Sequence, residues 1–138
     1  MNASELLRHQ IDNLGFQLDQ CYAGWNPDLL DEALTEGGMS ARTTLAHLCE
    51  CYVAAAKDTA GEKHEWGSYT LPDPAWDAAL AEWKTQRGKA ADLVCTDDEK
   101  SLKNGHAYIV SHDAYHVGQL CQLRIKLEPE WNSYGIYG

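Results

Sequence analysis

The chain has 138 residues, 44% of them hydrophobic, and this length is typical of one domain with one core. Its 21 acidic and 11 basic side chains give a formal net charge of −10 at pH 7, which argues against nucleic acid and anionic membranes as partners, because both bind basic surfaces. The N-terminus does not resemble a signal peptide, and no apolar run approaches the roughly 18–20 residues that span a bilayer. We therefore expect a cytoplasmic protein with a single domain over residues 1–138.

Hydrophobic residues recur at steps of three and four over about residues 4–22, which predicts a first long helix. Asn26 and Pro27 then resemble an N-cap and a first helical residue, so a short helix through Leu34 is expected. A second long helix is predicted from the N-cap candidate Ser40 to about residue 59.

Glycine, proline and mixed polar residues predict a connecting loop over residues 61–72, followed by a third amphipathic helix that starts with a cap and a proline at 73–74. Thr96 and Glu99 have the spacing of a capping box for a fourth helix, which stops before Pro129. An aromatic tail over residues 130–138 is expected to pack on the body. No strand-like alternation occurs, so the sequence predicts an all-α four-helix bundle.

Two histidines on the fourth predicted helix are the strongest functional signal. His112 and His116 are four residues apart, which places both imidazoles on one helix face, and they occupy the seam formed by Ile109 and Leu120. A buried imidazole needs a partner, and one shared metal ion would satisfy both. His47, on the second predicted helix, makes a three-histidine site possible.

Zinc, nickel and ferrous iron all accept neutral imidazole, and three histidine ligands leave a coordination position free. The alternative is that these are ordinary core or surface histidines, but the paired spacing with a third histidine favours a metal. Gln119, three residues after His116, is expected to orient that imidazole, and Asp113 either does the same or is a solvated charge. Glu50, three residues from His47, is the best candidate for a general base, with an exposed helix glutamate as the alternative.

The five cysteines, Cys21, Cys49, Cys51, Cys95 and Cys121, include no Cys-x-x-Cys pair and are expected to be reduced and buried. Cys51 is four residues from His47, so a histidine–cysteine ligand pair is geometrically open, but we favour plain core packing. His9, His64 and His106 are poorer ligand candidates; His64 lies in a loop beside Trp66, where it is either a lid residue or simply exposed.

The aromatic residues Trp66, Trp76, Trp83, Tyr52 and Tyr115 either wall an apolar substrate pocket or belong to the core. Aromatic residues at helical spacing are more often core residues, and we favour that interpretation.

Three segments together resemble the DinB-like (DinB/YfiT) superfamily of metal-binding four-helix bundles: GMSARTTLAHL over residues 38–48, HDAYHVGQL over 112–120, and PEWN over 129–132. The resemblance extends over essentially the whole chain. It implies a divalent-metal site formed by His47, His112 and His116, an up-down-down-up helix order and frequent homodimers.

Members of this superfamily include thiol S-transferases that use low-molecular-weight thiols, maleylpyruvate isomerases and metal-dependent hydrolases. The resemblance therefore implies an enzyme in which one zinc, nickel or iron ion activates a small thiol or water for attack on a small-molecule substrate. The alternative is a non-catalytic, stress-related metal-binding bundle. No catalytic residue is assigned from the sequence.

Overall fold

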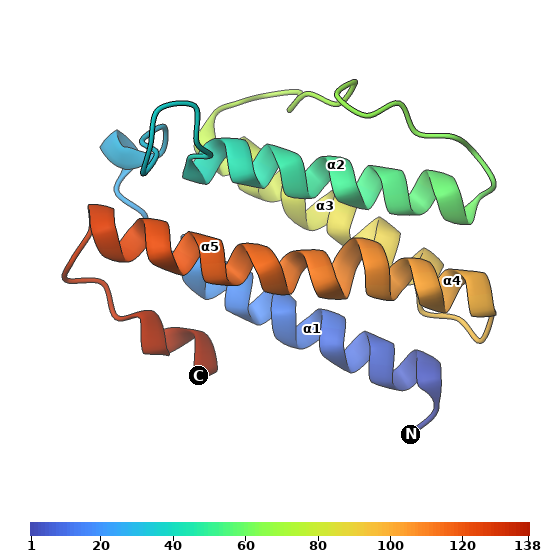
Figure 1. Ribbon diagram of the computed structural model, residues 1–138. Helices are drawn as coiled ribbons and strands as arrows, with labels where there is room; N and C mark the ends of the chain where they lie inside the picture. The colour runs from blue at the N-terminus through green and yellow to red at the C-terminus, as the bar shows by residue number, and fades with distance from the viewer.

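The computed structural model describes residues 1–138 and consists of helices and connecting segments, with no β-strand (Figure 1). In chain order the elements are α1 (Ala3–Tyr22), the 3₁₀ turn η1 (Pro27–Leu29), α2 (Ala41–Thr59), α3 (Trp76–Val94), α4 (Glu99–Asn104), the π-helical segment η2 (Gly105–Val110), α5 (Ser111–Leu127) and the 3₁₀ helix η3 (Ser133–Tyr137). Because α4, η2 and α5 follow one another without a break, the molecule contains four long helical rods. The all-helical architecture predicted from the sequence is confirmed.

The helices α2 and α3 begin at the same end of the molecule. The Arg42 guanidinium at the start of α2 donates a hydrogen bond to the Pro74 carbonyl just before α3. In Figure 1 the segment 60–75 runs back along the length of α2 to reach that end. The last residue of α1 lies there too, since the Tyr22 hydroxyl donates to the Ala41 carbonyl over 3.3 Å. As a result α2 packs along α3, and α1 packs along α5.

Side-chain caps fix where the first two long helices start. The Asn2 side chain accepts from the Glu5 amide and the Glu5 carboxylate accepts from the Asn2 amide, so α1 begins at Ala3 in a complete capping box. Ser40 caps α2 in the same reciprocal way with Thr43, which confirms the predicted start.

The short helix expected through Leu34 is a single 3₁₀ turn instead. Asn26 caps it as predicted, accepting from the Asp28 amide over 3.0 Å. The chain then leaves the helical path because Leu30 is buried in the core and its carbonyl accepts from the Arg42 amide at the start of α2. The prediction of a longer helix was therefore wrong.

The starts of the other two helices also differ from the prediction. The Asp73 carboxylate accepts from the Ala75 amide in a turn, and α3 begins only at Trp76. The predicted Thr96 capping box does not form. Asp98 is the N-cap of α4 instead, and its carboxylate accepts from the Ser101 amide over 3.0 Å.

The sequence pattern predicted a continuous α-helix for the fourth rod, but the rod is not α-helical throughout. Its middle is the π-helical segment η2, which begins at Gly105 and ends just before α5. A Cβ atom on Gly105 would lie 2.6 Å from the Leu7 side chain and 3.0 Å from the Val94 side chain. Glycine at this position therefore allows the rod to cross α1 and α3 closely.

The core is one cluster of 23 buried hydrophobic residues. They come from all four long rods and from the segment between α1 and α2, which contributes Trp25 and Leu30. The C-terminal tail packs back on the body as expected: Ile136 contacts the core, while Tyr134 and Tyr137 are 77% and 75% exposed. None of the helices combines the length and the apolar character needed to cross a lipid bilayer.

Candidate metal centre

The structure brings the three predicted histidines together. His47 on α2 and His112 on α5 approach each other until their Nε2 atoms are 2.9 Å apart. His116 lies one turn further along α5, with its ring centroid 4.9 Å from that of His112 and 5.1 Å from that of His47. Three imidazoles from two helices thus form one cluster. His112 and His116 lie on the same face of α5, as their i, i+4 spacing predicted.

His116 presents a ring nitrogen that nothing in the protein satisfies. The residue is 2% exposed, and its Nδ1 donates to the Gln119 side-chain oxygen over 2.8 Å, which confirms the predicted contact. Since Nδ1 then carries the proton, Nε2 is left as a lone-pair donor. That Nε2 is buried and has no hydrogen-bond partner. A buried polar atom without a partner is costly, and a metal ion is one way to satisfy it.

Cys51 also belongs to this cluster, which the core-packing interpretation did not anticipate. Its Sγ is 3.6 Å from His112 Nε2 and 3.8 Å from His47 Nε2, and the donor atoms of these three residues all lie within 4.8 Å of one another. The signal was present in the sequence, because Cys51 follows His47 by one helical turn. The compact donor set is thus His47, Cys51 and His112, with His116 beside it.

The spacing of these donors fits a small divalent ion. Bonds of about 2.0–2.1 Å to nitrogen and about 2.3 Å to sulfur in a tetrahedron separate nitrogen from sulfur by about 3.6 Å and two nitrogens by about 3.3 Å. The observed sulfur–nitrogen separations of 3.6 and 3.8 Å agree with this. The nitrogen–nitrogen distance of 2.9 Å is shorter, as expected where one imidazole donates to the other.

Burial favours the uncharged form of His112 and His116, which is the form that binds metals. It lowers the pKa of His112, with a smaller contribution from nearby His47, and it lowers the pKa of His116 to about 4. Burial also raises the pKa of the Cys51 thiol to about 12. At neutral pH His112 and His116 are therefore uncharged, while the thiol keeps its proton until a metal displaces it.

A buried ionic network fixes how α5 faces its neighbours. Asp113 is completely buried; it accepts from Arg87 Nη2 on α3 over 2.8 Å and from the Tyr52 hydroxyl on α2 over 2.7 Å. The Tyr52 oxygen in turn accepts from the Trp83 indole over 3.1 Å. Both sequence-based interpretations of Asp113, a contact to a ligand imidazole or a solvated charge, were wrong. It holds α5 in the rotation that turns His112 toward α2.

Arg87, the cation of this network, was missed in the sequence. It lies in the predicted apolar stripe of α3, four residues after Trp83 and three before Ala90, where a charged residue needs a buried partner. Gly15 on α1 makes room for it, since a Cβ atom there would be 2.6 Å from Arg87 Nη1. A charged residue in an apolar stripe was the available signal.

Glu50 and His64 form a second buried pair close to the cluster. Glu50 Oε1 lies 3.0 Å from His64 Nε2 and accepts from the Gly67 amide over 2.6 Å. The His64 side chain is only 4% exposed, and its Nδ1 has no partner. The alternatives of an exposed helix glutamate at Glu50 and an exposed loop histidine at His64 were therefore wrong. Burial alone would raise the pKa of Glu50, but the hydrogen bonds from His64 and Gly67 lower it overall.

The remaining candidates lie apart from the cluster. His9 and His106 are exposed, and the His106 ring forms a hydrogen bond with the Ser111 hydroxyl over 3.2 Å. The five aromatic residues do not wall one pocket: Tyr52 and Trp83 are core residues, Trp76 is partly buried against the core, and Trp66 and Tyr115 are exposed.

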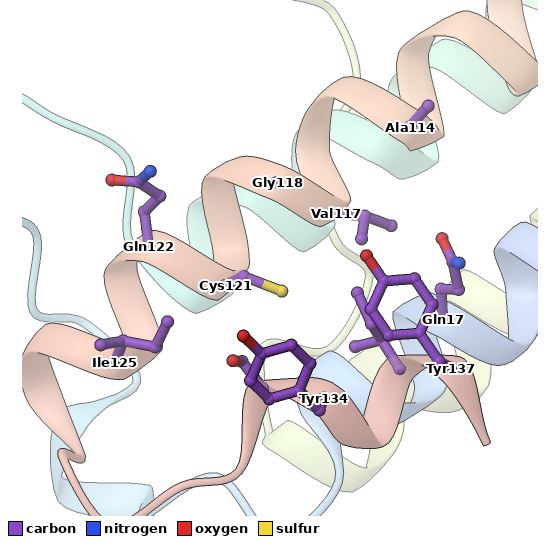
Figure 2. Close-up of a pocket in the computed structure, with 11 residues that line it drawn as sticks. Gln17, Ala114, Val117, Gly118, Cys121, Gln122, Ile125, Tyr134 and Tyr137 are labelled. Atoms are coloured by element: carbon purple, nitrogen blue, oxygen red, sulfur yellow. The ribbon is translucent and has the colours of Figure 1, made fainter.

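A groove of about 680 Å³ lies on another face of α5, against α1 and η3, and no histidine lines it (Figure 2). Comparison with protein-family models, curated proteins and solved structures finds no match for this chain.

Proposed function

We propose that this chain is a divalent-metal-binding helical bundle whose ligands are His47, His112 and His116. The observation that carries the proposal is the buried, unpartnered Nε2 of His116. It lies beside two further imidazoles whose Nε2 atoms are 2.9 Å apart. Neutral imidazole suits zinc, nickel and ferrous iron, and zinc or nickel is the first choice. The proposal includes the DinB-like up-down-down-up bundle, a cytoplasmic location and a homodimer.

The proposed activity is that of a metal-dependent thiol S-transferase or hydrolase acting on a small molecule. A divalent ion held by neutral ligands lowers the pKa of a bound thiol or water, which makes thiolate or hydroxide available near neutral pH. In this scheme Gln119 orients His116 through the 2.8 Å contact to Nδ1. Glu50, which is three residues from His47 and is hydrogen-bonded by His64 and Gly67, is proposed to accept a proton.

A second candidate function is non-catalytic metal binding, and the position of Cys51 favours it. If the Cys51 thiolate joins the three imidazoles, four protein ligands fill a tetrahedral sphere and no position is left for a substrate. Closed sites of this kind are structural. The number of protein ligands therefore separates the two candidates.

Elemental analysis of the purified protein tests metal binding. We expect about one equivalent of zinc, nickel or iron in the wild type, and loss of most of it in His112→Ala, because removing one imidazole typically weakens a site by more than the 10–100-fold that outer-shell changes cause. His106→Ala is the matched control, since that histidine is on the same rod and exposed. Circular dichroism checks that both variants fold. The proposed site is contradicted if the wild-type protein binds no metal even after incubation with the metal ion, or if the metal content of His112→Ala equals that of the wild type.

A further inference from the structure

A second pair of reactive side chains lies outside the histidine cluster. Cys21 near the end of α1 and Cys121 on α5 face each other with their sulfur atoms 3.8 Å apart. Cys21 is completely buried, while Cys121 is partly exposed. The two helices are tied together at this level, because Arg124 Nη1 donates to the Cys21 carbonyl over 2.8 Å. Neither cysteine forms a hydrogen bond with a histidine.

The groove between α5, α1 and η3 gives access to only one of these sulfurs. Cys121 is among the residues that line the groove of about 680 Å³, and Cys21 is not. Figure 2 shows the Cys121 sulfur directed away from α5, toward the side where Tyr134 and Tyr137 lie. The walls of the groove are mostly apolar, with Val117 and Ile125 on α5. A small apolar or aromatic molecule in the groove therefore meets Cys121 first, with Cys21 on the buried side.

We propose that Cys21 and Cys121 are a thiol pair that reduces small aromatic disulfides entering this groove. The Cys121 thiolate attacks the disulfide, forming a mixed disulfide and releasing one small thiol. Cys21 then attacks the Cys121 sulfur, forming a disulfide between α1 and α5 and releasing the second small thiol. The protein pair loses two electrons and two protons, and the small disulfide gains them.

The 3.8 Å separation makes the second step possible without unfolding. A disulfide bond is about 2.05 Å long, so the two sulfurs must approach by somewhat less than 2 Å, which side-chain rotation supplies. Cys49 and Cys51, two residues apart on α2, point in different directions from a helix and have no such partner. Cys95 has no sulfur in contact.

Burial makes both thiols slow to react. It raises the pKa of Cys121, although the contact with Cys21 partly offsets this effect, and it raises the pKa of Cys21 still further, with the Arg124 guanidinium opposing. The pair therefore stays reduced unless a disulfide is held in the groove beside it, because exchange requires a thiolate.

The test uses 2,2′-dithiodipyridine, a small aromatic disulfide whose released thiol absorbs light, together with intact-protein mass spectrometry and peptide mapping. The wild type should release two thiols per reaction, lose two hydrogens in mass and yield a peptide that links Cys21 to Cys121. Cys21→Ser should release one thiol and retain the pyridylthio group on Cys121. Cys121→Ser should react at least about tenfold more slowly, and Cys95→Ser should behave as wild type.

A further variant tests the groove as the route of entry. Gly118 lines the groove, and a Cβ atom added there would have no other atom within 4 Å, so Gly118→Leu should fold and slow the release by narrowing the groove. A wild type that does not react, that keeps the pyridylthio group, or that links other cysteines overturns the proposal. So does a Cys121→Ser variant that reacts at the wild-type rate. Metal content has no bearing on these outcomes, so the proposal stands or falls separately from the metal site.

Discussion

Replacing Arg87 with methionine is expected to lower the free energy of unfolding by about 3–5 kcal/mol, the usual loss when one partner of a buried ion pair is removed. The reason is that Asp113 is completely buried and would keep only the hydrogen bond from the Tyr52 hydroxyl. The Ile11 carbonyl would also lose the hydrogen bond that it accepts from Arg87 Nη2 over 2.6 Å. Urea denaturation followed by circular dichroism measures the change.

Two further variants distinguish the effect on stability of an uncompensated buried charge from the effect of losing a large side chain. Arg8→Met removes an arginine that pairs with Asp92 at the surface, and it should cost less than about 1 kcal/mol. Adding Asp113→Asn to Arg87→Met removes the uncompensated carboxylate and should recover a substantial part of the loss. An Arg87→Met variant no less stable than Arg8→Met would show that the network does not stabilise the fold.

Acidification is expected to destabilise the metal-free protein through His116. Its pKa in the folded protein is about 4, because burial disfavours the charged imidazole, whereas the ordinary value is 6.5. Between these values the unfolded chain binds a proton that the folded chain does not, so the free energy of unfolding falls as the pH decreases from about 6.5 to about 4. The contribution is fully present above that window and lost below it.

The comparison with His116→Gln isolates this contribution from the titration of carboxylates. The free energy of unfolding of the wild type minus that of the variant, measured in the presence of a chelator, should fall by about 1–3 kcal/mol across the window. A difference that does not change with pH would mean that His116 is protonated as easily in the folded protein as in solvent, and therefore is not buried in the way described.

The helical architecture was accessible from the sequence because three- and four-residue hydrophobic steps and side-chain caps are local signals. Ser40 caps α2 as predicted, and its capping box is encoded within four residues. The short helix expected through Leu34 failed because a tertiary contact, the bond from the Arg42 amide to the Leu30 carbonyl, overrides local preference. The π-helical segment was not predicted, because the close packing of Gly105 against α1 and α3 is a tertiary feature that the local sequence does not reveal.

The candidate site also combines features that local sequence patterns predict with features that depend on how the helices pack. The spacing of His112 and His116, and of Gln119 after them, follows from helix geometry, and the contact between Gln119 and His116 was predicted correctly. The approach of His47 depends on how α2 packs against α5, which helix periodicity alone does not determine. The burial of His64 under its loop depends on Glu50, and no pattern within either segment indicates that they meet.

Titration of the metal-free protein with Co²⁺ tests most directly whether the histidine cluster holds a single divalent ion. We expect visible absorption of the tetrahedral type that saturates at one equivalent in the wild type and is lost in His112→Ala. An additional near-ultraviolet band from a sulfur–cobalt bond, absent in Cys51→Ser, would identify the closed site, and its absence would favour the open one. Absorption that does not saturate, or that persists unchanged without His112, would contradict the metal centre itself.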